Sequence, residues 1–169
     1  MNVIAIDPGN EYSGFVILSE DYEVLDHGKP KNEELISTIR AGFFGTKVDA
    51  AAIEMIACYG MAVGREVFET CVWIGKFEEA IRPFTTNITH IYRRDEKVNL
   101  CNSLRAKDTN IKQALIDRFG EVGTKKNPGF FYGFSKDQWA AMAIGVTYLD
   151  MVKGLYVPVK NNGGEKNNE

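Results

Sequence analysis

The stretch IAIDPGNEYSG, residues 4–14, places an aspartate at the end of an apolar run and a turn sequence directly after it. The run before Asp7 is typical of a buried β-strand, and Pro8-Gly9-Asn10 ends that strand. Because Asp-Pro-Gly-Asn is a favourable β-turn sequence, Asp7 taken alone can be a turn residue. An unpaired carboxylate is nevertheless costly to bury, so its place at a strand end calls for a partner or a ligand.

The apolar pattern around this stretch predicts the first half of a mixed sheet. Residues 2–7, 13–19 and 22–28 favour three short strands joined by tight turns, which indicates an antiparallel meander. Residues 33–44 have apolar side chains at helical spacing, and residues 48–54 again favour a buried strand. A strand after a helical crossover usually lies parallel to an earlier one, so we expect the fourth strand beside the first.

The second half continues with helices and one more strand. We expect a helix at 62–81, a strand at 87–93, helices at 95–103 and 106–119, a loop at 121–134 and a last helix at 136–153. The predicted fold class is α/β, a mixed five-stranded sheet with helices on both faces. Residues 1–155 should form one domain, and residues 156–169 should form a flexible polar tail.

The composition is that of a globular protein, with 169 residues, 44% hydrophobic residues and a formal net charge of -3. No apolar run is long enough to span a membrane and the N-terminus lacks a leader pattern, so we expect a cytoplasmic protein. Cys58, Cys71 and Cys101 are far apart and lie in apolar runs. We interpret them as reduced core thiols rather than metal ligands or a disulfide.

Two further acids stand at the ends of predicted elements. Glu54 ends the strand at 48–54, where a salt bridge would explain it, and Asp137 opens the last helix, where it could serve as an N-terminal cap. If the first and fourth strands are parallel neighbours, Asp7 and Glu54 leave the same sheet edge, and the last helix can bring Asp137 there. Converging carboxylates repel one another, and divalent cations such as Mg2+ relieve that repulsion. Two such ions can promote phosphoryl displacement.

The apolar residues of the predicted helix at 62–81 cover more than half of its circumference. A sheet can cover only one stripe of a helix. The other stripe therefore needs either a second helix of the same chain or a second subunit, and the sequence leaves both open.

Positive charge is concentrated in one third of the chain. Residues 82–126 hold ten Lys or Arg against five Asp or Glu, whereas residues 1–81 hold six against 14. A local basic surface of this kind is what phosphate binding requires, although a merely solvated helix face would look similar.

Several of these segments together resemble the RuvC-like Holliday junction resolvases. IAIDPGNEYSGFVIL is similar to the first strand and hairpin of that family, AAIEMI to its second acidic strand, and KDQWAAMAIGVTY to its last, acid-bearing helix. VNLCNSLRAKDTNIKQALIDRFG resembles the branch from phages of Gram-positive bacteria. The resemblance extends, in the right order, over about residues 1–153.

The resemblance implies an RNase H-like fold, a homodimer and Mg2+-dependent hydrolysis of phosphodiesters in branched DNA. It implies two Mg2+ ions per active site, with Mn2+ as a substitute, no small-molecule cofactor and no membrane partner. The expected location is the cytoplasm of a bacterium or of a phage-infected host. Asp7, Glu54 and Asp137 would be the metal-binding catalytic acids. The family usually has a second acid on the last helix, but Ala140 stands three residues after Asp137, or Phe134 three residues before it, so one ligand is missing.

Under this resemblance the basic segment would bind the phosphates of the DNA arms, mainly without reading bases. Lys107 could also stabilise the negative charge that develops at the cleaved phosphate. Phe130, Phe131 and Tyr132 could fill the core under their loop or wedge into an opened junction. The expected DNA-binding residues are Arg93, Arg94, Lys97, Arg105, Lys107, Lys112, Lys125 and Lys126.

The sequence therefore predicts a structure-specific DNA endonuclease that cuts Holliday junctions or other branched DNA. Each subunit would cut one strand by in-line attack of a metal-activated water. Because one acid is missing, a branched-DNA binding protein with weak or no catalysis is an alternative, and so is an RNase H-like nuclease acting on RNA. An Asp-x-Gly ATPase or kinase would need two such domains, for which 169 residues are too few.

Overall fold

The computed structural model describes residues 1–58, 60 and 62–158, so residues 159–169 of the tail predicted at 156–169 lie outside the described residues. Most predicted elements are present, with ends shifted by one to three residues. The elements are β1 (Asn2–Asp7), β2 (Gly14–Ser19), β3 (Val24–Gly28), α1 (Asn32–Arg40), a 3-10 turn η1 (Phe43–Gly45), β4 (Ala50–Met55), α2 (Arg65–Ile81), β5 (Ile88–Tyr92), α3 (Arg93–Cys101), α4 (Asp108–Phe119) and α5 (Lys136–Val152).

The helix predicted at 33–44 is shorter than expected. It ends at Arg40, and Gly42 follows with a φ of 97°, a left-handed conformation that a continuing α-helix does not allow. The 3-10 turn η1 then places the buried Phe43 in the core. The apolar Phe43 is therefore buried as its pattern predicts, but by a 3-10 turn and not by a helix.

The sheet has the strand order β3-β2-β1-β4-β5. Strands β1, β2 and β3 form the predicted antiparallel meander, and β4 is parallel to both β1 and β5. In the β1–β4 register Ile6 lies opposite Ile53. The next residues along these two strands are Asp7 and Glu54, so the predicted neighbourhood of the two acids follows from the pairing.

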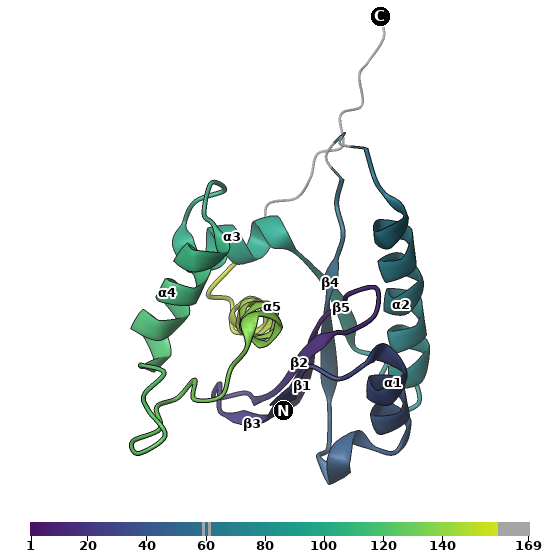
Figure 1. Cartoon of the computed structure of the whole chain (residues 1–169), viewed down its shortest axis with the longest axis horizontal. Coiled ribbons are helices and arrows are strands. Elements are labelled where there is room, and N and C mark those ends of the chain that lie inside the picture. The colour runs from purple at the N-terminus through teal and green to yellow at the C-terminus, as the bar shows by residue number, and fades with distance from the viewer. Residues whose placement is uncertain (59, 61, 159–169) are drawn as a thin grey trace, which may run out of the picture.

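Side chains alternate between the two faces of the sheet, and each face has its own core (Figure 1). On β1, Val3 and Ala5 belong to the core beneath α5, whereas Ile4 and Ile6 belong to the core beneath α1 and α2. Helices α3 and α4 lie beyond α5 on its side of the sheet (Figure 1). Two hydrophobic faces on one sheet explain why its strands are nearly uninterrupted apolar runs.

Helix α5 lies close to the sheet because small residues line the contact. A Cβ atom added at Gly145 would come within 2.7 Å of Leu18 and 3.1 Å of Ala5. Any larger side chain there would push the helix away from β1 and β2. This close approach fixes the start of α5, and with it Asp137, near the end of β1.

Helix α2 buries only one of its apolar stripes within the chain. Ile74 and Phe77 are buried against the sheet, but 62% of Phe68 and 57% of Val72 remain exposed. Cys71, between them, is exposed as well. Intramolecular packing therefore does not cover the second stripe, which we call the outer α2 face and define as Phe68, Cys71 and Val72.

The exposure of particular side chains bears on two other expectations from the sequence. The three cysteines are free, but the prediction that they are core thiols is wrong, because Cys71 is exposed and Cys58 and Cys101 are only partly buried. In the aromatic run of the loop before α5, Phe131 fills the core, whereas Phe130 and Tyr132 remain 37% and 44% exposed. Among the described residues, no helix is both long and apolar enough to cross a membrane.

Candidate active site

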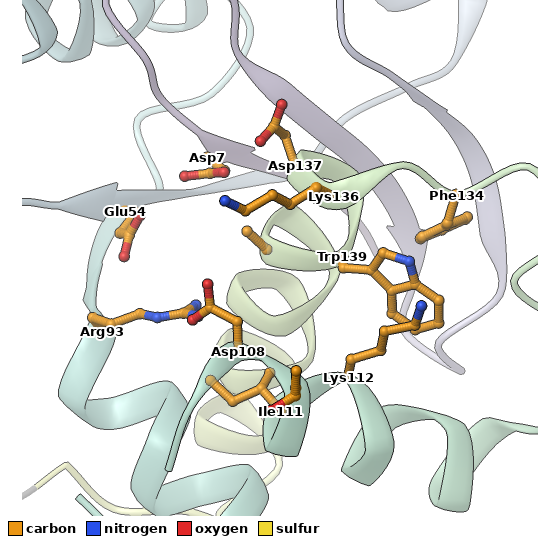
Figure 2. A pocket seen from close by; sticks show the side chains of 12 residues that line it. Asp7, Glu54, Arg93, Asp108, Ile111, Lys112, Phe134, Lys136, Asp137 and Trp139 are labelled. Carbon is orange, nitrogen blue, oxygen red and sulfur yellow. The ribbon is translucent and has the colours of Figure 1, made fainter. Parts of the chain in front are cut away.

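A pocket of about 630 Å³ opens where β1 and β4 end and α4 and α5 begin (Figure 2). All three predicted acids and two of the predicted DNA-binding residues, Arg93 and Lys112, line it. Lys107, Arg105, Lys125 and Lys126 are exposed and are not part of its lining. The lining residues are Asp7, Glu54, Arg93, Asp108, Thr109, Ile111, Lys112, Phe134, Lys136, Asp137, Trp139 and Ala140.

The carboxyl groups of Asp7 and Glu54 lie close enough to influence each other's ionisation. Burial, followed by the negative charges of Glu54 and Asp137, raises the pKa of Asp7 to about 8, against an opposing effect of Arg93. A carboxyl group with such a pKa is partly protonated near neutral pH. A divalent cation bound by these carboxyl groups would relieve the same repulsion that protonation of Asp7 relieves.

Asp137 reaches the pocket because Gly14, the first residue of β2, leaves room for α5 to approach that strand. A Cβ atom at Gly14 would lie 2.3 Å from the backbone oxygen of Asp137, and Gly14 is paired with Asp7 across β1 and β2. Asp137 is not the cap of α5, since Ser135 occupies that position and its N–H donates to the Gln138 side chain at 2.5 Å. Instead the carboxylate of Asp137 forms an ion pair with Lys29, which follows β3.

Arg93 joins a second group of acids at the pocket wall. Its Nη1 donates to Oε2 of Glu96 at 2.5 Å, and its Nη2 donates to Oδ1 of Asp108 at 2.5 Å. Glu96 is fully buried in the first turn of α3. Neither acid is predicted from the sequence, and for Glu96 the reason is that RRDEKV, residues 93–98, looks like an exposed, charged helix face. The only signal was the position of Glu96 just after β5.

Two lysines supply positive charge inside the pocket. Lys136 reaches in from the start of α5, and Lys112 comes from α4 with its Nζ 4.8 Å from the centre of the Trp139 ring (Figure 2). Lys136 was not among the predicted DNA-binding residues. Lys107 lies at the N-terminal end of α4, where its backbone N–H donates to Asn110 Oδ1 at 2.8 Å.

Apolar side chains occupy both positions at which a further acid was expected, Ala140 on α5 and Phe134 just before that helix. Phe134 and Ala140 each form part of the pocket wall. Within the described part of the chain, no three His, Cys, Asp or Glu side chains are grouped so that they could hold a metal ion as they stand. The pair Asp7 and Glu54 is closest to such a group, while Asp137 is engaged by Lys29.

No protein-family model matches this sequence, and no curated protein matches it significantly. Solved structures do match. RuvC of Thermus thermophilus in complex with a Holliday junction substrate aligns with a TM-score of 0.71 and 16% identity, covering 94% of this chain and 99% of that chain. A second Thermus thermophilus RuvC structure aligns with a TM-score of 0.67 and 17% identity, over 94% and 100% of the two chains. The match confirms the predicted RNase H-like fold.

Proposed function

We propose that this protein is a structure-specific endonuclease that cuts Holliday junctions or other branched DNA by divalent-metal-assisted hydrolysis of phosphodiesters. The observation that carries the proposal is the meeting of Asp7, Glu54 and Asp137 in one pocket that Lys112 and Lys136 also line. Acids that can hold cations, with lysines in the same pocket, suit the binding of a phosphodiester. The likeness of the whole fold to a resolvase bound to its junction adds support.

The chemistry of the acids fits Mg2+, with Mn2+ as a substitute. Asp7, Glu54 and Asp137 offer only oxygen ligands, which hard divalent cations prefer, and the raised pKa of Asp7 reflects its burial and the unrelieved repulsion from the other two acids. These three residues would hold the ions, two per active site, once Asp137 is released from Lys29. When bound there, divalent cations would supply Lewis-acid chemistry and lower the pKa of a water molecule.

The chain's own residues would position the DNA. Lys112 and Lys136 would contact the phosphate nearest to the acids, because they line the same pocket. Arg93 is held by Glu96 and Asp108, so we propose that it fixes the pocket wall in addition to its predicted phosphate contact. The duplex arms would lie along the remaining predicted residues, namely Arg94, Lys97, Arg105, Lys107, Lys125 and Lys126.

We further propose that the active unit is a homodimer formed through the outer α2 face. Phe68 and Val72 are large apolar side chains that are more than half exposed on a well-formed helix. A symmetric dimer buries the same patch on both subunits, and a self-complementary apolar stripe suits that arrangement. Two active sites would then cut two strands of one junction.

A second candidate is a branched-DNA binding protein with little catalysis. The ion pair of Asp137 with Lys29 favours it, since the third acid is neutralised by a cation of the chain itself. The apolar side chain of Ala140 favours it as well, because no acid stands there.

The proposal is tested by incubating end-labelled four-way and fork DNA with the protein in Mg2+, in Mn2+ and in EDTA. Nicking near the branch point that requires the cation supports the endonuclease. Tight junction binding in EDTA, without cleavage in either cation, would establish the binding protein instead. Linear duplex and single-stranded RNA serve as control substrates. Cleavage of RNA in preference to junctions would contradict the proposed substrate.

The origin of the protein is proposed from the sequence resemblance alone. VNLCNSLRAKDTNIKQALIDRFG, residues 98–120, supports a relationship to the resolvases of phages from Gram-positive bacteria. On that basis the protein would act in the cytoplasm of a bacterium or of a phage-infected host.

A further inference from the structure

Glu96 has a buried carboxylate oxygen without a partner. The side chain is 0% exposed, and its Oε2 accepts a hydrogen bond from Arg93 at 2.5 Å. Its Oε1 is buried and has no hydrogen-bond partner among the described residues. Leaving such an oxygen unsatisfied costs roughly 1–3 kcal/mol, and more when the group is charged. An orphaned carboxylate oxygen is therefore a strong indication of a missing ligand.

The topology brings Glu96 to the acids of the pocket. Strands β1, β4 and β5 are adjacent and parallel, so their carboxyl ends meet at one edge of the sheet. Asp7 ends β1, Glu54 lies near the end of β4, and Glu96 lies in the first turn of α3, directly after β5. Three neighbouring elements thus each deliver one acid to the same edge.

The electrostatics agree with this placement. Burial raises the pKa of Glu96 well above its ordinary value, and the charges of Glu54 and Asp7 raise it further, while Arg93 acts in the opposite direction. Glu96 must therefore lie near both acids of the pair. Arg93 is the cation among these groups, and it also neutralises Asp108. If Asp7, Glu54 and Glu96 were all ionised, they would carry more negative charge than Arg93 can offset, so these acids either bind protons or need a cation.

We propose that Glu96 is the fourth acid of this site, and that it holds a divalent cation together with Asp7 and Glu54 in place of the carboxylate missing at position 140. The inference rests on the proposed function, because it assigns a residue of the same site. A divalent cation would bind Oε1 of Glu96 and would offset the negative charge of the acids that Arg93 does not neutralise. The missing acid of α5 is then supplied from the first turn of α3, where Glu96 lies buried behind the pocket-lining Arg93.

The test measures metal binding without DNA. Mn2+ is titrated calorimetrically into the metal-free protein, and the Mn2+-induced rise of the unfolding temperature is recorded as a second readout. Glu96→Gln keeps the shape of the side chain and its contact with Arg93 but removes the charge. We expect Glu96→Gln to weaken Mn2+ binding at least roughly tenfold and to reduce the thermal shift accordingly. Glu33→Gln, in the exposed first turn of α1, is the matched control and should bind Mn2+ like the wild type.

The possible outcomes separate this inference from the proposed function. If Glu96 only positions Arg93, Glu96→Gln will lower the unfolding temperature in EDTA and leave Mn2+ affinity unchanged, and that result overturns the inference alone. If the wild-type protein binds no Mn2+, both the inference and the metal-dependent function fail. Should Glu96→Gln not fold, Glu96→Asp replaces it, since it keeps the charge but withdraws the oxygens by one methylene. Unchanged Mn2+ affinity in that variant likewise overturns the inference.

Discussion

The carboxyl groups of Asp7 and Glu54 lie close together in one pocket, although their strands, β1 and β4, are separated in the chain by two further strands and a helix. The contact arises because β1 and β4 are parallel neighbours with Ile6 opposite Ile53. Two acids in such contact need a shared proton or a cation. Most of the following predictions test whether a proton or a bound cation relieves the repulsion between these acids.

Asp7→Asn should abolish cleavage and retain DNA binding. The substitution removes the central acid of the pocket but keeps its shape, so the loss of Mg2+-dependent nicking should exceed the roughly 10–100-fold effect typical of a second-shell change. Four-way DNA affinity, measured in EDTA, should stay close to that of the wild type or increase, because one negative charge is lost. Asp21→Asn, an exposed acid in the turn after β2, is the control. Nicking at the wild-type rate by Asp7→Asn would exclude the proposed catalytic site.

The stability of the metal-free protein should fall as the pH rises toward 8. The pKa of Asp7 is about 8 in the folded protein, through burial and the charges of Glu54 and Asp137, against an ordinary value of 3.8. The folded state therefore binds more protons than the unfolded state between these two values, and the free energy of unfolding decreases with increasing pH there. Unfolding temperatures in EDTA at pH 5 and pH 8 measure this decrease. Asp7→Asn should flatten it, and an equal decrease in both proteins would contradict the assignment.

Lys29→Met should strengthen Mn2+ binding. Lys29 neutralises Asp137 in the metal-free protein, and its removal frees that carboxylate for a cation. Because the pair is partly exposed, the gain should be modest, at most about fivefold in affinity. Calorimetric titration of Mn2+ measures it. Weaker Mn2+ binding by the variant would show instead that Lys29 helps to position Asp137.

Lys112→Gln and Lys136→Gln should each weaken DNA binding at low salt. Both lysines line the pocket, and each lost phosphate contact should reduce the salt dependence of the association constant by about one unit of logarithmic slope. Fluorescence anisotropy with labelled four-way DNA at several salt concentrations gives this slope. Lys47→Gln is the control, because Lys47 precedes β4 and so lies at the opposite end of that strand from Glu54. An unchanged slope in both pocket variants would place the DNA elsewhere.

Val72→Glu should convert the proposed dimer to a monomer. A charge on the outer α2 face would be buried without a partner in a symmetric interface, and that is unfavourable. Light scattering coupled to size-exclusion chromatography determines the mass of the particle. Val152→Glu at the end of α5 is the matched control, since Val152 is 54% exposed and Val72 is 57% exposed. A wild-type protein that is monomeric at all concentrations would refute the dimer.

The amino-acid sequence by itself determined the sheet and the meeting of its acids. Apolar runs of strand length, the turn after Asp7 and the single crossover before β4 left one sensible arrangement, in which parallel pairing had to bring Asp7 and Glu54 together. These features depend on periodicity and chain order, and both can be read from the sequence.

Only the tertiary structure decided which charged groups are buried and which partners they have. RRDEKV has the composition of a solvated helix, yet the way α3 leaves β5 and packs against α5 buries Glu96 completely. The ion pair of Lys29 with Asp137, and the choice of Lys112 and Lys136 over Lys107 as pocket residues, likewise depend on how distant elements are oriented. Charge partners are set by distance in space, and no local pattern of the sequence encodes that distance.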